Sequence, residues 1–359
     1  MPRPLLLSSG LMAALIVAYF ALWPVPVTPV AWEAPPDPGY TGPFAPDSLL
    51  TGLERISIGA FTGPEGVARD REGRIYVSTR EGAIVRLAAD GRQPEMWAQT
   101  GGRPLGLAFD SAGTLYVADG ARGLLAIDRT GVVRLLADSV DGTPIAFADD
   151  LDVAADGRVY LSDASTKFGM LARAAEDASV LDIIEHGGHG RLLEYDPASG
   201  RIAVLRRGLD FANGVAISHD GQSVLLSETG HYRILRIRRD GPRRGEGEVV
   251  IGELPGFPDN IKRGSGGRYW IALFAPRNAL LDRLSGWPSA RRMLLRIPKF
   301  LQPAARDYGH VIAIDESGHV VDDRHDPTGA YPNMTSVLET ERHLYVGSLS
   351  APFLARVGR

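Results

Sequence analysis

Five oxygen-bearing side chains stand at positions from which they could share one divalent cation. They are Glu65, Asp149, Asn213, Asp259 and Asn260. Oxygen ligands of this kind suit Ca²⁺ best, followed by Mg²⁺ or Mn²⁺. Carboxylates that converge without a counter-charge cannot all stay ionised, and no Lys or Arg occupies an equivalent position to neutralise them. The alternative is a water-filled channel lined by acids of raised pKa, without a metal.

A repeated hairpin pattern places these side chains in one register. Five glycines precede β-rich runs at a turn, and the residues eight positions before them are Glu65, Leu105, Asp149, Asn213 and Asp259. A sixth, degenerate copy has Arg342 at the turn, and the same count leads to Met334. Strand pairs that recur about every 40–60 residues are typical of a β-propeller, whose innermost strands line a central channel. The pattern therefore predicts an all-β, six-bladed propeller with the site at one mouth of its channel.

Composition agrees with this fold and excludes several classes of function. The chain has 359 residues, of which 42 are glycine, and a net charge of −4. The glycine content fits a turn-rich all-β chain. The sequence has no dense run of basic residues, so nucleic acid is not expected as a partner. The absence of cysteine excludes disulfides and thiolate metal sites.

The N-terminus predicts a membrane anchor over residues 1–24. The stretch Leu5–Trp23 carries no charge, and its length is close to the ~20 residues that a helix needs to cross a bilayer. Arg3 ahead of it favours a cytoplasmic N-terminus. We therefore expect a single-pass membrane protein whose propeller lies on the periplasmic, extracytoplasmic side. A cleaved signal peptide is the alternative, although no A-x-A site precedes Pro24.

The remaining organisation follows from composition and spacing. Residues 25–48 form a proline-rich linker, expected as an extended spacer, and residues 49–359 form the propeller. The alternating run Leu53–Ile58 predicts a strand that closes the ring against the last blade. Residues 278–300 have helical spacing of apolar residues. We interpret them as an insertion that caps the channel mouth or touches the membrane.

The histidines carry weaker signals. His186 and His189 have H-x-x-H spacing but no evident third ligand, so we interpret them as part of a surface loop. His219 and His310 stand alone and are expected to be structural. No G-x-S-x-G motif of a serine hydrolase is present.

Several runs, taken in order, resemble the strictosidine synthase-like family, and in particular its adipocyte plasma membrane-associated branch. The resemblance extends from about Gly63 to the end, and the runs that carry it are Arg103–Leu107, Asp149–Asp152, Val159–Phe168, Gly190–Asp196, Ala212–Val215 and Pro255–Ile261. It implies a six-bladed propeller with calcium in the channel, within a superfamily that includes paraoxonases, gluconolactonases and senescence marker protein. By this resemblance the calcium ligands fall on Glu65, Asp149, Asn213, Asp259 and Asn260.

The chain also departs from its apparent relatives. Asp149 stands where that superfamily usually has asparagine, which adds a negative charge. Gly66 replaces the acid that a second calcium would need, so that site is not expected despite Asp150. The histidine pair of paraoxonases falls on Leu105 and Gly120. The glutamate of strictosidine synthase falls at or near Thr335.

These features predict a calcium-dependent, arylesterase-like hydrolase of esters or lactones. Calcium would polarise the carbonyl and stabilise the oxyanion, and Asp259 would act as general base towards the attacking water. Leu105 and Met334 favour a partly hydrophobic ester as substrate. One alternative is a non-enzymatic binding propeller with structural calcium. Another, disfavoured by Thr335, is a condensing enzyme of the strictosidine synthase type. An enzyme requires an open pocket over the metal, whereas a binding module could have a plugged channel.

Overall fold

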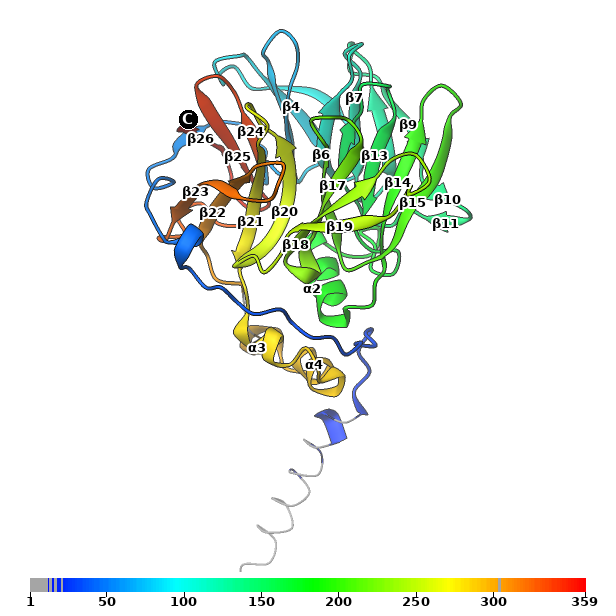
Figure 1. The fold of residues 1–359 in the computed structure, drawn as a ribbon, viewed down its shortest axis with the longest axis vertical. Helices are drawn as coiled ribbons and strands as arrows, with labels where there is room; N and C mark the ends of the chain where they lie inside the picture. The colour runs from blue at the N-terminus through cyan, green and yellow to red at the C-terminus, as the bar shows by residue number, and fades with distance from the viewer. Residues whose placement is uncertain (1–11, 13–14, 16–17, 21, 303–304) are drawn as a thin grey trace, which may run out of the picture.

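The computed structural model describes Met12, Leu15 and residues 18–20, 22–302 and 305–359. In this part of the chain the strands form six four-stranded antiparallel sheets around a central axis, and a small hairpin, β10–β11 (Ser139–Val140 and Thr143–Pro144). Figure 1 shows the blades fanned around the axis, with the short helices gathered at one face. The predicted all-β, six-bladed propeller is confirmed.

The first three blades follow one another along the chain, each from its inner to its outer strand. Blade 1 consists of β2 (Val67–Arg69), β3 (Ile75–Ser78), β4 (Ala83–Leu87) and β5 (Glu95–Gln99). Blade 2 consists of β6 (Pro104–Phe109), β7 (Leu115–Asp119), β8 (Gly123–Ile127) and β9 (Val133–Ala137). Blade 3 consists of β12 (Ala148–Val153), β13 (Val159–Asp163), β14 (Gly190–Asp196) and β15 (Arg201–Leu209).

The last three blades complete the ring. Blade 4 consists of β16 (Ala212–Ile217), β17 (Ser223–Glu228), β18 (Arg233–Arg238) and β19 (Gly247–Ile251). Blade 5 consists of β20 (Gly256–Arg263), β21 (Tyr269–Pro276), β22 (Gly309–Ile314) and β23 (Val320–Asp326). Blade 6 consists of β24 (Met334–Glu339), β25 (His343–Ser348), β26 (Leu354–Gly358) and β1 (Glu54–Ile56).

Both ends of the propeller sequence meet in blade 6. Strand β1 pairs antiparallel with β26, with Glu54 opposite Arg356 and Ile56 opposite Leu354. Ile56 and Leu354 pack in one hydrophobic cluster with residues of blade 1. The predicted closing strand is therefore confirmed, and the ring is held shut by backbone hydrogen bonds as well as by apolar burial.

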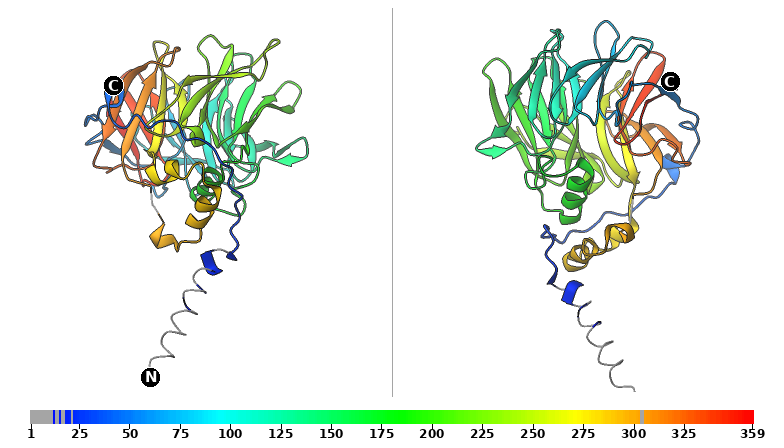
Figure 2. Two further views of the ribbon diagram at one scale, coloured as in Figure 1. Left: turned by 60° about the horizontal axis from the view of Figure 1, so that its bottom comes forward. Right: turned by 180° about the vertical axis from the view of Figure 1, so that it is seen from behind.

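The helices lie outside the blades and on one face. Helix α2 (Ala175–Glu185) is inserted between β13 and β14. Helices α3 (Ala279–Arg283) and α4 (Pro288–Leu294) and the 3-10 turn η3 (Lys299–Leu301) lie between β21 and β22. Two further 3-10 turns are η1 (Gly42–Phe44) and η2 (Thr229–His231). Figure 2 shows α2, α3 and α4 covering the same end of the propeller.

The proline-rich segment is extended, but it is bound along this helical face for much of its length. Val30 N donates to Glu185 O at 2.8 Å, and Trp32 N donates to Ser285 O at 3.2 Å. Farther along, Leu50 N donates to His325 O at 2.9 Å. We call residues 24–50 the strap, because they tie the helices of blades 3 and 5 to the outer part of blade 5.

Most of the predicted membrane segment lies outside the described residues. The described part of it ends beside residues 278–300, which we call the lid, where Tyr19 Oη donates to Arg296 O at 2.8 Å. Among the residues that the structure describes, no helix has the length and apolar character needed to cross a membrane. The membrane anchor therefore stays a prediction.

The inner strands of blades 2 to 6 share an irregularity at the same place. Their pairing registers shift between Pro104 and Leu107, Ala148 and Leu151, Ala212 and Val215, Pro258 and Ile261, and Met334 and Val337. Such bulges turn a side chain out of the strand's regular alternation. In blades 2 to 5 the residue after the start of the shift is the predicted site position, and in blade 6 it is Thr335, so the fold itself creates the shared register.

Glycines next to the site positions allow the inner strands to approach one another closely. A Cβ on Gly66 would lie 2.1 Å from Leu105 O, and one on Gly106 would lie 2.4 Å from Asp150 Oδ1. A Cβ on Gly214 would lie 2.3 Å from Ile261 N and 2.6 Å from Asp259 O. All these separations are shorter than van der Waals contact, so the ring of inner strands can close only with glycine here.

The substitution Gly214→Ala tests this packing. The added methyl group meets backbone atoms of blade 5, which cannot rotate away, so we expect a loss of about 1–3 kcal/mol in the free energy of unfolding. Gly286→Ala is the matched control, because a Cβ there has no neighbour within 4 Å among the described atoms and should change stability by less than about 0.5 kcal/mol. Urea unfolding of both variants measures the difference, and equal stabilities would contradict the packing argument.

Candidate metal and catalytic site

The structure brings the predicted site residues together at one end of the channel. Asp149 lies in β12, Asn213 in β16, and Asp259 with Asn260 in β20, while Glu65 lies two residues before β2. Four of them line a cavity of about 430 Å³, and Asn260 reaches the same place through its Nδ2, which donates to Glu65 Oε1 at 2.8 Å. Leu105 supplies the apolar position of blade 2. Their role as metal ligands remains a prediction.

The sixth position was predicted wrongly by one residue. Met334 is fully buried in a hydrophobic cluster with Trp270 and Val311, and Thr335 lines the cavity instead. The hairpin turn of blade 6 spans residues 340–342, whereas that of blade 2 spans residues 110–114. Counting back from the shorter turn therefore displaces the register. The bulge after Met334 identifies Thr335 as the equivalent of Leu105.

Burial of three carboxylates in one place dominates the electrostatics of the site. Glu65, Asp149 and Asp259 are only 2%, 5% and 8% exposed. Burial, reinforced by the mutual repulsion of the acids, holds the pKa of Asp149 and of Asp259 well above their usual range. Burial also raises the pKa of Glu65 from its ordinary 4.5 to about 7, although the nearby Arg103 guanidinium acts in the opposite direction. The acids therefore hold protons near neutral pH unless a cation replaces them.

Three buried oxygens of the site have no hydrogen-bond partner among the described residues. They are Glu65 Oε2, Asn213 Oδ1 and Asn260 Oδ1. Leaving such atoms unsatisfied costs about 1–3 kcal/mol each, and native structures rarely do so without an ion or a water. Three orphaned oxygens beside two further carboxylates fit a hard cation with six to eight oxygen ligands, which describes Ca²⁺.

A lysine and an arginine lie near these acids, although the repeat register contains no basic residue. Lys262 Nζ lies 2.5 Å from Oδ1 of the buried Asp150, and Asp150 Oδ2 accepts from Val215 N at 2.9 Å. Lys262 is two residues beyond Asn260 in β20, so the strand's alternation directs it into the channel. Asp150 is thus already paired with a cation of the chain. The positive charges missing from the register are supplied at neighbouring positions, by Lys262 and Arg103.

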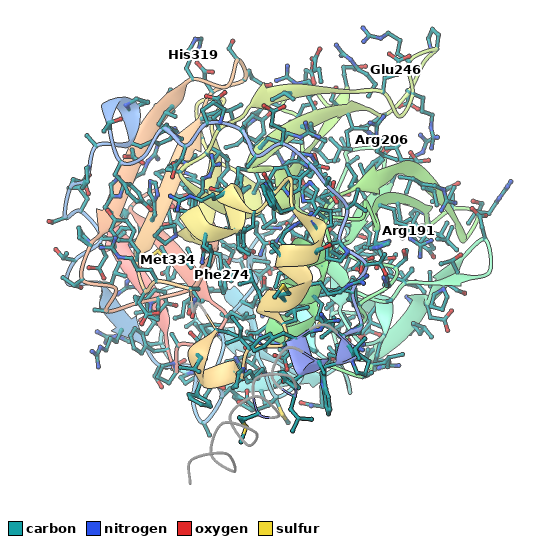
Figure 3. The ribbon with its side chains drawn as sticks, turned by 90° about the horizontal axis from the view of Figure 1, so that it is seen from below. Arg191, Arg206, Glu246, Phe274, His319 and Met334 are labelled. Carbon is teal, nitrogen blue, oxygen red and sulfur yellow. The ribbon has the colours of Figure 1, made fainter. Side chains whose placement is uncertain are left out.

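An apolar cavity lies over the oxygen cluster. Its walls include Phe147 and Phe211 from the propeller, Ile183 from α2, Leu281 from α3 and Leu294 from α4. Figure 3, seen from below, shows α3 and α4 crossing this face over the region of Phe274. The predicted cap at residues 278–300 is therefore found over the channel mouth. The contribution of α2 was not predicted, because its helical pattern is short and mixed with polar residues.

The histidines correct the sequence interpretation. His186 is 5% exposed and not part of a surface loop, and it lies near Asp210 and His231. His189 is partly exposed, with Nε2 at 2.7 Å from Glu185 Oε1. His310 does not stand alone, since it forms a cluster with Asp323 and His325. The partners of His186 and His310 are 13 to 45 residues away in the sequence, which the local H-x-x-H spacing could not reveal.

Comparison with known proteins identifies relatives along nearly the whole chain. A family model described as strictosidine synthase matches residues 149–241, and one described as strictosidine synthase-like, N-terminal, matches residues 42–87. Adipocyte plasma membrane-associated protein of Salmo salar is 33% identical, over 99% of this chain and 90% of its own. Strictosidine synthase-like protein 4 of Arabidopsis thaliana is 32% identical, over 88% of this chain and 84% of its own.

Solved structures share the fold at lower identity. A gluconolactonase of Xanthomonas campestris aligns with a TM-score of 0.61 and 18% identity, covering 85% of this chain and 88% of its own. Regucalcin of Agrobacterium tumefaciens, described as a calcium-binding protein, aligns with a TM-score of 0.58 and 17% identity, covering 85% of this chain and 94% of its own. At such identities the likeness shows a common propeller architecture.

The raised carboxylate pKa values predict how stability depends on pH when no divalent ion is bound. Between pH 4.5 and 7 the folded chain holds a proton at Glu65 that the unfolded chain has lost. Stability is therefore highest at the acidic end of this window and falls as the pH rises through it. With a chelator present, we expect the melting temperature to fall by several degrees from about pH 5 to about pH 8.

Calcium should reverse this trend, because binding requires deprotonated carboxylates. Added Ca²⁺ should raise the melting temperature strongly at about pH 8 and little at about pH 5. Glu65→Gln is the matched control and should reduce the pH dependence measured in chelator, while the part due to Asp149 and Asp259 remains. A chelated chain whose melting temperature rises with pH over this range would contradict the electrostatic account.

Proposed function

The chain belongs to the strictosidine synthase-like family that includes the adipocyte plasma membrane-associated proteins, and from this we propose that it is a membrane-anchored, calcium-dependent hydrolase of esters or lactones. One observation carries the proposal: buried, incompletely partnered oxygens form the floor of an apolar cavity of about 430 Å³. A cation held there would be open to a bound molecule from above. The gluconolactonase and regucalcin neighbours are consistent with such chemistry on this fold.

The cavity favours an enzyme over a non-enzymatic binding propeller. A plugged channel would leave the cation enclosed by protein, whereas Glu65, Asp149, Asn213 and Asp259 all line the cavity. Thr335 occupies the position compared with the strictosidine synthase glutamate, and its Oγ1 donates to Glu65 O at 2.9 Å. No carboxylate is therefore present at that position to assist an amine–aldehyde condensation, which argues against a condensing enzyme.

The residues of the chain divide the proposed chemistry among them. Bound Ca²⁺ would supply Lewis acidity towards the ester carbonyl and its developing negative charge. Asp259 is the proposed general base, since its carboxylate lines the cavity and its Oδ1 is held by the backbone N–H of Asn260 at 3.0 Å. The second carboxylate oxygen is then available to take a proton from water. Phe147, Phe211 and the lid helices exclude bulk water and hold the apolar part of the substrate.

The cavity's lining favours a lipophilic acyl or alkyl group over a sugar acid. Leu281, Leu294 and Leu295 line it from the lid, and Val180 and Ile183 line it from α2. The outer side of the lid also exposes large apolar residues, with Phe300 84% exposed and Trp287 and Leu301 similarly uncovered. Arg296 Nε donates to Trp23 O at 2.8 Å, which ties the end of the predicted anchor to this lid. A lid that faces the bilayer would admit apolar esters directly from it.

Site variants test the hydrolase directly. The full-length chain in detergent is assayed with phenyl acetate and an alkyl-substituted lactone, with Ca²⁺ and with a calcium chelator. Asp259→Asn keeps an oxygen for the metal but removes the base, so kcat/KM should fall about 100-fold or more. Glu65→Gln removes one ligand charge and should raise the Ca²⁺ concentration needed for half-maximal activity.

The control for these variants is Glu72→Gln, an exposed acid in the turn between β2 and β3, which should behave as wild type. Hydrolysis that persists fully in chelator would exclude a metal-dependent reaction. If Ca²⁺ raises the melting temperature but neither substrate is turned over, the metal is structural and the binding propeller becomes the better account.

The lid variant Leu281→Ser tests substrate selection. Removing an apolar side chain from the cavity wall should lower kcat/KM for long-chain p-nitrophenyl esters about 10-fold relative to short-chain esters. Trp287→Ser is the control, because Trp287 is exposed on the same lid and is not among the residues lining the cavity. If both variants change chain-length preference equally, or if Leu281→Ser leaves it unchanged, the lid does not select the substrate.

A further inference from the structure

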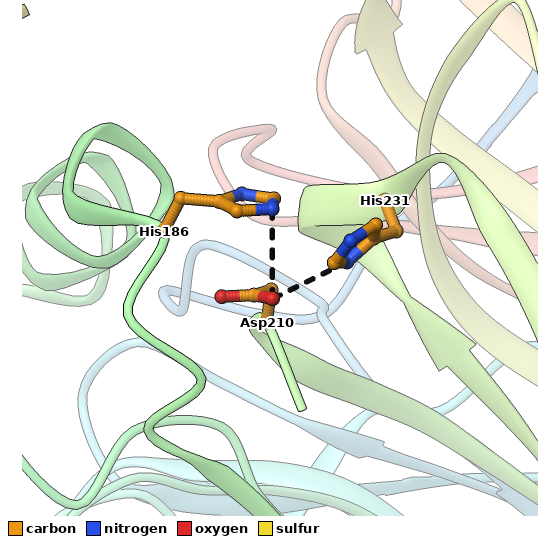
Figure 4. Close-up of side chains that lie close together, drawn as sticks. All are labelled: His186, Asp210 and His231. Atoms are coloured by element: carbon orange, nitrogen blue, oxygen red, sulfur yellow. Dashed lines mark ion pairs between the residues drawn. The ribbon is translucent and has the colours of Figure 1, made fainter. Parts of the chain in front are cut away.

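A second group of possible metal ligands lies outside the channel. His186 follows the last residue of α2, Asp210 lies just before β16, and His231 ends η2. Figure 4 shows the imidazole rings of His186 and His231 both directed towards Asp210, with dashed lines marking the two ion pairs. Glu228, the last residue of β17, adds a buried carboxylate next to His231. None of these four side chains is among the residues that line the cavity.

We propose that His186, Asp210 and His231 bind a transition-metal ion such as Zn²⁺, with a water molecule as the fourth ligand. The relevant atoms are already at suitable separations. Asp210 Oδ2 lies 3.5 Å from His186 Nε2 and 3.3 Å from His231 Nδ1. Ligands placed tetrahedrally at about 2.0–2.1 Å from zinc stand about 3.4 Å apart.

The same separations are poor for hydrogen bonds, whose N···O distances cluster near 2.9 Å. Both ring nitrogens of His186 and Nδ1 of His231 have no hydrogen-bond partner among the described residues. His186 is 5% exposed, so water does not compensate for this loss. An imidazole buried in this state calls for an unobserved partner, and its Nε2 faces the carboxylate of Asp210.

Hydrogen bonds from neighbouring groups hold the ligands in orientations that suit a metal. Gly188 N donates to Asp210 Oδ1 at 2.7 Å, which leaves Oδ2 to face the two histidines. Arg233 Nε donates to Glu228 Oε2 at 2.6 Å and Asp210 N donates to Glu228 Oε1 at 3.0 Å, so Glu228 holds the backbone of Asp210 in place. Such outer contacts orient metal ligands.

The other histidine cluster shows what a hydrogen-bonded arrangement looks like in the same protein. His310 Nε2 and His325 Nε2 lie 2.6 Å from the two separate oxygens of Asp323, and His325 Nδ1 lies 3.0 Å from Tyr308 Oη. Three of the four ring nitrogens there have short contacts with a partner. The His186 cluster has the same residue types but longer separations, so composition alone does not explain the difference.

The donor set separates this site from the channel. Two imidazole nitrogens favour Zn²⁺ or a neighbouring transition metal, whereas the oxygen-only channel favours Ca²⁺. The site also lies where α2, blade 4 and the strap meet. Trp32 of the strap stacks on His186 with ring centres 3.9 Å apart and an angle of 12°. A metal here would fasten α2, blade 4 and the strap to one point.

Zinc titration in the presence of excess Ca²⁺ tests the proposal. The full-length chain is stripped of metals, saturated with Ca²⁺, and titrated with ZnCl₂ by calorimetry and with CoCl₂ by visible absorption. We expect one Zn²⁺ per chain and the intense absorption of tetrahedral Co²⁺. His231→Gln and Asp210→Asn should each weaken Zn²⁺ binding by more than about 10-fold, the lower limit seen even for loss of an outer-shell contact.

Two histidine variants locate the ion. His219→Gln removes an exposed histidine, and His325→Gln disrupts the other cluster, so neither should change the affinity. Asp210→Asn keeps an oxygen for Gly188 N–H, and an unchanged Ca²⁺-dependent melting temperature confirms that the variant is folded. The proposal is overturned if the wild type takes up no Zn²⁺ under excess Ca²⁺, if both site variants bind as wild type, or if His325→Gln alone abolishes binding.

Discussion

The structure depends on the convergence of acidic side chains at the axis of the propeller. Three buried carboxylates repel one another and lose their hydration, so they must be neutralised by protons or by a cation. Their raised pKa values are the sign of this constraint. The chain neutralises one neighbouring acid itself, through the contact of Lys262 with Asp150, and leaves the remaining three facing an open cavity. Asp150 therefore contributes an internal ion pair, whereas Glu65, Asp149 and Asp259 are available to bind an ion.

Backbone geometry makes this convergence possible. Bulges in the inner strands turn one side chain per blade towards the axis, and glycines such as Gly66 and Gly214 let adjacent inner strands come closer than any other residue would allow. The two features act together, since a bulge without close approach would leave the ligands too far apart. The pairing of β1 with β26 closes the ring that maintains these distances.

The sequence could predict the site wherever the repeat was regular. The spacing from turn to inner strand is constant in the first five blades, so Glu65, Asp149, Asn213 and Asp259 could be found by counting. It failed at Met334, because the last hairpin has a shorter turn. The His186 cluster could not be predicted, since Asp210 and His231 reach it from separate elements of blade 4. The path of the strap could not be predicted either, because a proline-rich composition indicates an extended chain but not the surface to which it binds.

The strap and α2 connect the two sites physically. Ile183 lines the cavity above the oxygen cluster, and three residues later His186 stacks against Trp32. Glu185 between them accepts from Thr28 N at 2.7 Å and from Lys167 Nζ at 2.5 Å. One end of α2 therefore forms part of the wall of the proposed substrate cavity, while the same turn is fixed to the strap. The wall that α2 gives to the cavity is therefore supported from behind by the strap.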